Sequence, residues 1–333
     1  MATVAVLGAG GWGTALAVTA DRHGHAVSLW SPFEEEIESI RRHGQNTKLL
    51  PGIAVPKSIE LTTDLSCVSQ AELVIMAVPS FAIASTAEKL RPYLGTGVVV
   101  ANAGKGLEKG TYRRFTEVIS AALPGVPVVA LSGPSHAEEV GRGIPTLIVS
   151  ASQDIVAAET VQRILMNPQF RVYTTEDVIG VELGGALKNV IALAAGICDG
   201  LDMGDNTRAA LMTRGMAEIA RLGVHLGAKP GTFSGLSGIG DLIVTCSSMH
   251  SRNRRAGILI GQGFTSKEAV ERVGTVEGYL VAETAYRLAQ QNGISLPIVE
   301  ACYRICYEGY SPEQAVRSLM ERPGRSEDDE QWL

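Results

Sequence analysis

The chain has 333 residues, and at roughly 150 residues per domain this predicts two domains, each large enough to bury a core. Hydrophobic residues make up 45% of the chain and charged residues 19%, a composition that excludes an extended disordered chain. The net charge of −6 and the aromatic content of 5% argue against a nucleic-acid-binding surface and a polybasic membrane binder. An anionic small molecule stays compatible, because its site needs only a few local cations.

The sequence also carries signals about compartment. No cationic segment precedes the first apolar stretch, so we expect no secretory signal. No run of about 18 uninterrupted apolar residues occurs, so we expect no transmembrane helix and no membrane insertion. Five cysteines without a framework spacing fit a reducing compartment. Cys302 and Cys306 are expected to be partly buried thiols, and no metal site is predicted. The sequence therefore predicts a cytoplasmic protein.

The first half of the chain alternates apolar β-rich runs with helical stretches. A helix is predicted over Thr14–Arg22 and strands over the following ranges: Val4–Leu7, Ala26–Trp30, Leu73–Val78, Val98–Asn102, Val126–Leu131 and Phe170–Tyr173. This alternation indicates right-handed βαβ crossovers and a mostly parallel sheet. Because ligands of such sheets collect at the carboxyl ends of the strands, the turns after these strands are expected to face one crevice.

From about residue 177 onward the pattern is helical. Helices are predicted over Val178–Ile197, Asn206–Leu226, Arg252–Gly261, Ser266–Val273, Val281–Asn292, Pro297–Glu308 and Pro312–Met320. The polar tail 325–330 is expected to be frayed. The predicted fold is an α/β Rossmann-like domain over 1–180, with a mostly parallel sheet, followed by an all-α domain over 181–333.

A glycine-rich turn follows the first predicted strand. Gly8, Gly10 and Gly13 match the pattern G-x-G-x-x-G, and the required strand and helix flank it. The first glycine permits a tight turn, the second lets a pyrophosphate approach the backbone, and the third lets the helix pack on the sheet. The free N–H groups of the helix N-terminus favour an anion. The sequence therefore predicts a dinucleotide site, with an ordinary βα turn as the alternative.

The end of the second predicted strand bears on the choice between NADH and NADPH, but its signal is weaker than that of the glycine turn. Ser31 and Pro32 stand where a dinucleotide-binding sheet places its ribose-reading residue, and Glu34–Glu36 follow. We favour these glutamates as the first turn of the next helix over a role in ribose binding. Arg41 and Arg42 are expected on the outer face of that helix; the alternative is that they reach back to the strand end across a short loop. We expect NADH to be used at least as well as NADPH.

Several residues point to an anionic substrate. Lys105 lies in a glycine loop at a predicted strand end, and Gly133 and Ser135 end another strand. Lys188 interrupts an apolar helix, where it either snorkels to the surface or stays inside for chemistry. Asp241 is either an N-cap or the partner that orients a catalytic lysine.

Ser251–Arg255 opens a helix with three arginines, a combination that suits a phosphate. The alternative is a solvated basic face. We expect one of the arginines to point inward and the other two to point outward.

Taken together, these strings resemble NAD(P)-dependent glycerol-3-phosphate dehydrogenases of the bacterial type over nearly the whole chain. The resemblance is carried by Gly8–Gly13, Ala103–Glu108, Leu131–Ser135, Gly184–Asn189, Thr213–Glu218, Gly238–Leu242, Ser251–Arg254 and Val276–Tyr279. It implies reversible hydride transfer between NAD(P)H and dihydroxyacetone phosphate, giving sn-glycerol 3-phosphate, a precursor of glycerophospholipids. It also implies a homodimer. Many bacterial relatives carry an arginine where this chain has Ser31 and Pro32.

The resemblance also assigns residues. The catalytic residues implied are Lys188, Asp241 and Lys105, with Lys188 as the proton donor and acceptor. The implied substrate shell is Lys105, Gly133, Ser135, Lys188, Asn189, Asp241, Thr245, Ser251, Arg252 and Asn253. The implied contacts of NAD or NADP are Gly8, Gly10, Gly11, Trp12, Gly13, Lys105, Ala137, Arg252 and Glu277. Two other functions stay open: a related Rossmann β-hydroxyacid dehydrogenase and a non-catalytic nicotinamide-binding regulator.

Overall fold

The computed structural model describes residues 1–324 and 326–327, so most of the tail expected to be frayed lies outside the described residues. By its internal contacts the chain divides into two compact units. The first comprises 1–104 and 113–178, and the second comprises 105–112 and 179 onward. The sequence predicts one continuous domain over 1–180. Instead the segment Lys105–Tyr112 packs with the helical unit.

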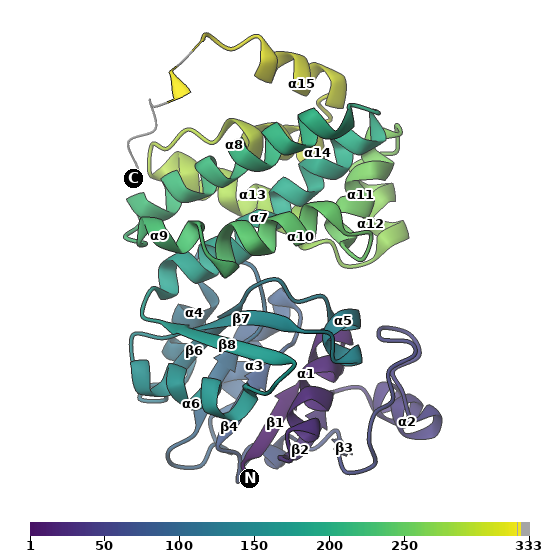
Figure 1. The fold of residues 1–333 in the computed structure, drawn as a ribbon, viewed down its shortest axis with the longest axis vertical. Coiled ribbons are helices and arrows are strands. Elements are labelled where there is room, and N and C mark those ends of the chain that lie inside the picture. Colours follow the sequence, from purple (N-terminus) through teal and green to yellow (C-terminus); the bar gives the residue numbers. More distant parts are fainter. Residues whose placement is uncertain (325, 328–333) are drawn as a thin grey trace. The chain divides into compact units, whose positions relative to one another are not determined.

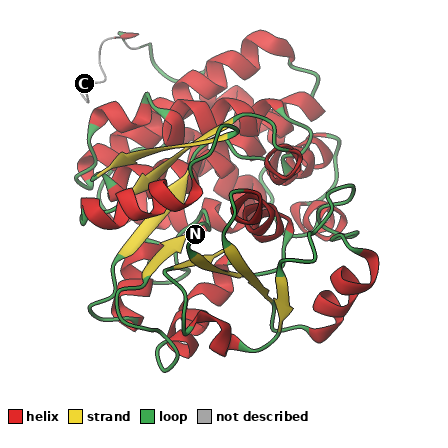
Figure 2. Ribbon diagram, turned by 60° about the horizontal axis from the view of Figure 1, so that its bottom comes forward, coloured by secondary structure: helices red, strands yellow, loops and turns green. Residues whose placement is uncertain are grey.

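The first unit is built on one eight-stranded sheet, whose strands are visible in Figures 1 and 2. Its order is β3-β2-β1-β4-β5-β6-β7-β8. The strands are β1 (Thr3–Leu7), β2 (Ala26–Trp30), β3 (Glu60–Thr62), β4 (Leu73–Met76), β5 (Val99–Asn102), β6 (Val128–Ser132), β7 (Thr146–Ala151) and β8 (Phe170–Thr175). All neighbouring pairs are parallel except β6 and β7. This confirms the mostly parallel α/β sheet.

Two strands of the sheet, β3 and β7, lie outside the predicted strands. β3 has only three residues and a half-exposed pattern, so it gives little periodic signal. β7 does carry a β-branched run, Thr146–Ala151, although no strand is predicted there. The predicted strand Leu73–Val78 ends at Met76, two residues earlier than expected and shortly before the turn that contains Pro79.

Helices cover both faces of the sheet. Their bounds are α1 (Gly11–Arg22), α2 (Glu34–His43), α3 (Ile83–Leu90), α4 (Phe115–Ala122), α5 (Ala137–Arg142) and α6 (Ile155–Leu165), with short helical turns at Leu65–Val68 and Ser80–Ala82. Alternate strand residues face opposite layers. Val4 and Val6 join the core under α1, α5 and α6, whereas Ala5 and Leu7 join the core under α3 and α4.

The described part of the second unit is helical apart from its loops (Figure 1). Its helices are α7 (Val178–Gly200), α8 (Gly204–His225), α9 (Pro230–Phe233), a π-helical turn (Leu236–Gly240), α10 (Asp241–Ser247), α11 (Arg252–Gly261), α12 (Ser266–Val273), α13 (Glu277–Gln291), α14 (Pro297–Tyr307) and α15 (Pro312–Met320). The predicted helix over 281–292 begins four residues earlier, at Glu277.

Helix α7 is the central element of the helical unit, since its side chains contribute to both of the unit's apolar cores. By length and composition alone, an 18-residue window of α7 is apolar enough to span a membrane, whereas the sequence predicts no such helix. However, 94% of that window is buried inside the protein. Its apolar surface is therefore already covered by protein.

Candidate functional site

The glycine turn between β1 and α1 has the geometry that a pyrophosphate requires. Gly8 has φ +113°, a conformation that favours glycine. A Cβ on Gly13 would lie 1.9 Å from the carbonyl oxygen of Gly8, whereas a Cβ on Gly10 would meet nothing within 4 Å. Gly13 is therefore required by the fold, and Gly10 leaves open space beside the backbone. No described side chain caps the N-terminus of α1, so its N–H groups fit an anionic group of a dinucleotide.

A loop between α2 and β3 packs against this turn. Asn46 is buried, and its side-chain amide donates to the carbonyl oxygen of Ala9 at 2.8 Å and to the hydroxyl of Thr14 at 3.1 Å. The carbonyl oxygen of Leu49 lies 2.5 Å from the Cβ position of Gly11. Asn46 thus holds the turn in place, a role that sequence reasoning missed because no motif marks it.

Two other proposed cofactor contacts belong to the same unit. Trp12 is half-buried against the core that includes Val4 and Val6. Ala137 begins α5, and its Cβ lies 3.8 Å from the Cβ position of Gly11. The structure therefore brings Ala137 to the glycine turn, although about 126 residues of chain separate Ala137 from Gly11.

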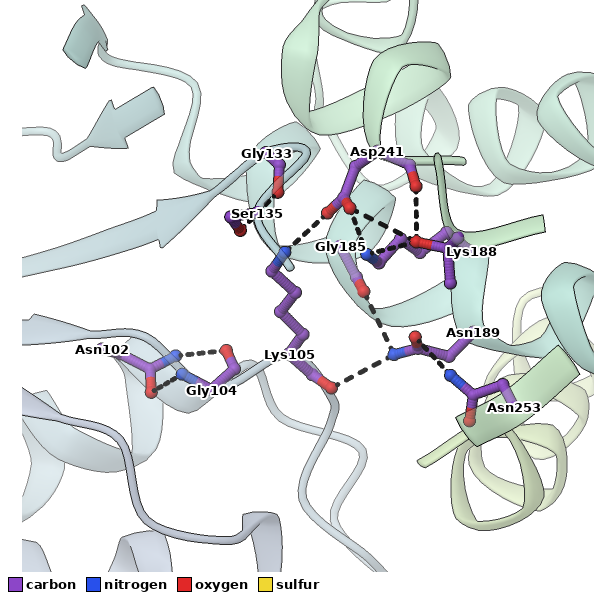
Figure 3. Close-up of polar contacts among 11 residues, drawn as sticks. Asn102, Gly104, Lys105, Gly133, Ser135, Gly185, Lys188, Asn189, Asp241 and Asn253 are labelled. Atoms are coloured by element: carbon purple, nitrogen blue, oxygen red, sulfur yellow. Dashed lines mark hydrogen bonds and ion pairs between the residues drawn. The ribbon is translucent and has the colours of Figure 1, made fainter. Parts of the chain in front are cut away.

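Gly133 and Ser135 follow β6 in the first unit. Gly133 has φ +135°, and the Ser135 hydroxyl donates to the Gly133 carbonyl oxygen at 2.8 Å (Figure 3). This internal bond fixes the bend after the strand. β1, β4, β5 and β6 are all parallel to one another, so the turns that follow them lie at the same edge of the sheet, as expected.

The helical unit gathers several of the charged candidates around Asp241. The ammonium of Lys188 forms an ion pair with Oδ1 of Asp241 and donates to the Thr245 hydroxyl at 2.8 Å. The ammonium of Lys105 reaches Oδ2 of the same carboxylate at 2.8 Å (Figure 3). Asp241 is 1% exposed and Lys188 is 5% exposed. The geometry thus supports an interior position for Lys188 over a snorkelling one. It also supports a role for Asp241 in orienting the lysine over a role as an N-cap.

Local packing explains how Asp241 reaches Lys188. Asp241 begins α10 directly after the π-helical turn, and α7 lies against that turn. A Cβ on Gly184 of α7 would lie 2.6 Å from the carbonyl oxygen of Ser237. Only glycine permits this approach, one helical turn before Lys188. The Thr245 hydroxyl donates back to the Asp241 carbonyl oxygen at 2.6 Å, which fixes its side chain toward the lysine.

Burial and charge shift the titration of this cluster. Burial lowers the pKa of Lys188 to about 7; the nearby Lys105 adds to this lowering, and Asp241 opposes it. Burial acts to raise the pKa of Asp241, but the two lysines outweigh it and hold the pKa below its ordinary value. Two ammonium groups share one carboxylate, so one positive charge is left to stabilise an oxygen that becomes negative.

The two asparagines form a chain of hydrogen bonds beside this cluster. The Asn189 amide donates to the carbonyl oxygen of Gly185 at 3.3 Å and to that of Lys105 at 3.5 Å, and it accepts from Asn253 at 2.8 Å (Figure 3). Asn253 in turn accepts from the Gly278 N–H at 2.8 Å. The backbone of Lys105 is thereby tied to α7, α11 and the start of α13, where Glu277 is the first residue.

The arginine cluster has the expected arrangement, with one arginine pointing inward and two exposed. Arg254 points inward: its guanidinium pairs with Asp199 at 2.7 Å and donates to the Ser247 carbonyl oxygen at 2.6 Å. Arg252 and Arg255 are exposed. Ser251 caps α11 by accepting from the N–H of Arg254 at 3.2 Å. Arg254 is therefore a structural residue, because its guanidinium joins the start of α11 to the half-buried Asp199 of α7.

The remaining expectations concern thiols, metals and the first turn of α2. Cys302 and Cys306 are free and buried. Within residues 1–324 and 326–327, no group of three or more histidine, cysteine or acidic side chains could hold a metal ion. Glu34–Glu36 do form the first turn of α2, as expected.

Comparison with known families agrees with the resemblance seen in the sequence. Residues 3–158 match the model described as the NAD-dependent glycerol-3-phosphate dehydrogenase N-terminus, and residues 177–317 match the corresponding C-terminus. A protein of Moorella thermoacetica named glycerol-3-phosphate dehydrogenase [NAD(P)+] is 55% identical over 324 residues, covering 96% of each chain. One of the same name from Desulfitobacterium hafniense is 50% identical over 99% of this chain and 94% of its own length.

Solved structures give the same result. The crystal structure of glycerol-3-phosphate dehydrogenase from Coxiella burnetii superposes with a TM-score of 0.93 at 39% identity, over 96% of this chain and 99% of that one. The structure of the Saccharomyces cerevisiae glycerol-3-phosphate dehydrogenase gives a TM-score of 0.82 at 27% identity, over 96% of this chain and 99% of that one.

Proposed function

Because the chain belongs to the NAD-dependent glycerol-3-phosphate dehydrogenase family, we propose that it transfers hydride reversibly between NAD(P)H and dihydroxyacetone phosphate, giving sn-glycerol 3-phosphate, a glycerophospholipid precursor. The observation that carries this proposal is the buried Asp241 carboxylate shared by Lys188 and Lys105. A non-catalytic nicotinamide-binding regulator would have no use for two lysines on one buried acid.

The glycine turn fits a dinucleotide, since Gly10 opens onto free space and the N-terminus of α1 offers N–H groups. Gly8, Gly10, Gly11, Trp12, Gly13 and Ala137 would hold it in the first unit, and Lys105, Arg252 and Glu277 are the proposed contacts from the second. When bound, the nicotinamide supplies or accepts the hydride at the carbon of the substrate.

Lys188 acts on the substrate oxygen. During reduction, its ammonium donates a proton to the carbonyl oxygen as negative charge develops there, and in the reverse direction the neutral amine takes the proton back. A pKa of about 7 lets Lys188 hold and release a proton near neutrality. Asp241 and Thr245 hold the ammonium in place, and Lys105 supplies a second positive charge beside it.

Arg252 is proposed to bind the substrate phosphate, together with Ser251, Asn253, Asn189, Gly133 and Ser135 around the substrate. An arginine at the exposed N-terminus of α11 can grip a phosphate with two parallel hydrogen bonds. Binding energy from this remote group then orients the ketone for reaction.

The direct test is oxidation of NADH and NADPH with a panel of phosphorylated and carboxylated ketones. We expect turnover with dihydroxyacetone phosphate and none with β-keto acids. Turnover with the carboxylated compounds alone would assign the chain to the β-hydroxyacid dehydrogenases instead, and no turnover with any compound would favour the regulator.

Arg252→Ala tests the phosphate contact. The substitution should weaken productive binding of dihydroxyacetone phosphate by roughly 2–5 kcal/mol and change that of unphosphorylated dihydroxyacetone much less. Arg255→Ala is the matched control, since both side chains are exposed on α11. Arg254→Ala is not suitable as a control, because it breaks the pair with Asp199.

The resemblance also supports two proposals about the whole molecule, a homodimer and a cytoplasmic location. Analytical ultracentrifugation of the purified protein and fractionation of cells that express it test these directly. A monomeric sedimentation coefficient or recovery with the membrane fraction would contradict them.

A further inference from the structure

The carboxyl end of β2 lies directly beside the glycine turn. The N–H of Gly8 donates to the carbonyl oxygen of Trp30, the last residue of β2, at 2.8 Å. The next residue, Ser31, therefore occupies the position from which a dinucleotide-binding sheet reaches the adenosine ribose. In such sheets an acidic residue about 20 positions beyond the turn accepts a hydrogen bond from the ribose 2′-hydroxyl. Ser31 itself is not acidic.

Ser31 nevertheless brings an acid to this position. Its side chain is 1% exposed, and its hydroxyl donates to Oε2 of Glu36 at 2.6 Å while accepting from the N–H of Phe33 at 3.3 Å. These two bonds fix both the hydroxyl and the carboxylate. Glu36 is half-buried in the first turn of α2. A carboxylate offers about four lone-pair sites, so the bond from Ser31 leaves capacity for a further donor.

The cations nearest in sequence to Glu36 are Arg41, Arg42 and Lys48. Arg41 forms an ion pair with Glu38 and donates to the Leu61 carbonyl oxygen of β3 at 2.8 Å. Arg42 lines a hollow together with Glu34, Glu35 and Glu38. Lys48 is exposed in the loop that packs on the glycine turn. Lys48 is therefore the alternative candidate for a residue that binds the 2′-phosphate of NADPH.

We propose that Glu36, positioned by Ser31, makes this enzyme select NADH over NADPH. This inference rests on the proposed dinucleotide-dependent function and names the selectivity of that same site. The 2′-hydroxyl of NADH can donate to the Glu36 carboxylate. The 2′-phosphate of NADPH offers no such donor when ionised and places negative charge against Glu36, with Glu34 and Glu35 in the same helical turn. Solvent screening reduces this repulsion but does not reverse its sign.

The experiment measures both dinucleotide binding and turnover. Isothermal titration calorimetry with NAD⁺ and NADP⁺ gives dissociation constants without any reaction, and kcat/KM is measured for NADH and NADPH with dihydroxyacetone phosphate. For the unmodified protein we expect a preference for the non-phosphorylated cofactor of about tenfold or more, which corresponds to about 1.4 kcal/mol. Because calorimetry needs no turnover, it reports on Glu36 even if the proposed reaction fails.

Glu36→Gln is the decisive variant. It removes the charge and keeps an oxygen that can accept from Ser31, so the fold of this end of β2 is retained. The preference should fall to within about threefold, mainly through tighter NADP⁺ binding. Glu35→Gln is the matched control, because it removes the same charge from an exposed residue of the same helical turn. It should change the preference by no more than about twofold.

Ser31→Ala tests the positioning. It frees the Glu36 carboxylate without changing the net charge, so it should weaken NAD⁺ binding and leave NADP⁺ binding nearly unchanged. An equal change of the cofactor ratio in Glu36→Gln and Glu35→Gln would reduce the effect to general surface charge and overturn the assignment. A preference for NADP⁺ in the unmodified protein, lost in Lys48→Ala, would overturn it in favour of Lys48.

Discussion

The glycine turn of the first unit and the Lys188–Asp241 cluster of the second differ in the groups that they offer to a ligand. The turn offers backbone N–H groups and space, and its key residues have no side chains at all. The cluster gathers two lysines around one carboxylate that is 1% exposed. The turn therefore depends on shape, and a single methyl group is enough to disturb it. The cluster depends on charge balance, so it responds to protonation and to the loss of one partner.

This contrast separates binding from chemistry. A backbone site of this kind contributes equally to the ground state and the transition state, because its donors do not change charge. A buried lysine with a pKa lowered to about 7 can change protonation state during the reaction, so its contribution is concentrated in the transition state. Substitutions in the two regions should therefore alter different measured quantities.

The largest expected effect comes from Lys188→Ala. Removing the proton donor should lower kcat for dihydroxyacetone phosphate reduction by at least ~10²-fold, while calorimetry shows unchanged NAD⁺ binding. Lys109→Ala is the matched control, because that lysine is 81% exposed and pairs only loosely, at 3.4 Å, with Glu283. Near-normal turnover of Lys188→Ala would remove Lys188 from the mechanism and erase the distinction between the two regions.

Two alanine substitutions in the glycine turn sharpen the same contrast. Gly13→Ala forces a methyl group to within 1.9 Å of a carbonyl oxygen and should lower the free energy of unfolding by about 1–3 kcal/mol, seen as a lower Tm. Gly10→Ala, where φ is −70° and the space is open, should keep the Tm and weaken NAD⁺ binding instead. If both variants lose stability and keep their affinity, the turn is not a dinucleotide site.

The pH dependence of turnover tests the charge balance. Because reduction uses the ammonium form of Lys188, whose pKa is about 7, kcat should fall as the pH rises above about 7. Asp241 raises that pKa, so Asp241→Asn should move the fall to lower pH. Thr245→Val removes a hydrogen bond and no charge, and should move it less.

The Asp241→Asn variant also leaves two lysines without their carboxylate, which costs about 3–5 kcal/mol of stability when a buried pair is broken. The pH profile is therefore recorded at a temperature where circular dichroism shows the variant to be folded. A profile identical to that of the unmodified enzyme would show that Asp241 does not tune Lys188.

The smallest expected effect concerns a buried acid outside the site. Glu218 of α8 accepts from the N–H groups of Ile298 and Val299 at the start of α14, at 2.8 and 3.2 Å. Burial raises its pKa from 4.5 to about 7. Between these values the folded state keeps a proton that the unfolded chain releases, so stability is highest below 4.5 and is lost as the pH rises toward 7.

The stability of the unmodified protein should therefore fall with a slope of at most about 1.4 kcal/mol per pH unit in this window. Urea unfolding of Glu218→Gln should lack this component, while Glu300→Gln, an exposed glutamate on α14, should retain it. An unchanged slope in Glu218→Gln would assign the pH dependence to other groups.

Particular elements and residues show how much of the fold and of the site could be predicted from the sequence. The helix over Arg252–Gly261 and the strand over Ala26–Trp30 have the predicted bounds, because caps and local periodicity set them. The glycine turn was recognisable from its spacing and its flanking strand and helix. Lys188 was marked as unusual, since a lysine in an apolar helix is costly to bury without a partner. The partner itself stayed an open choice.

Tertiary structure decided which groups meet. Asp241 is 136 residues from Lys105 and 53 residues from Lys188, and no local pattern encodes such a contact. The inward arginine is Arg254, because Asp199 of α7 lies next to it, and Ser31 matters through the acid five residues later. By itself, then, the sequence determined the elements, the glycine turn and the chemical types of the candidates, which depend on local spacing. The pairing of charges required the packed fold, because a buried charge takes its partner from whichever segment packs against it.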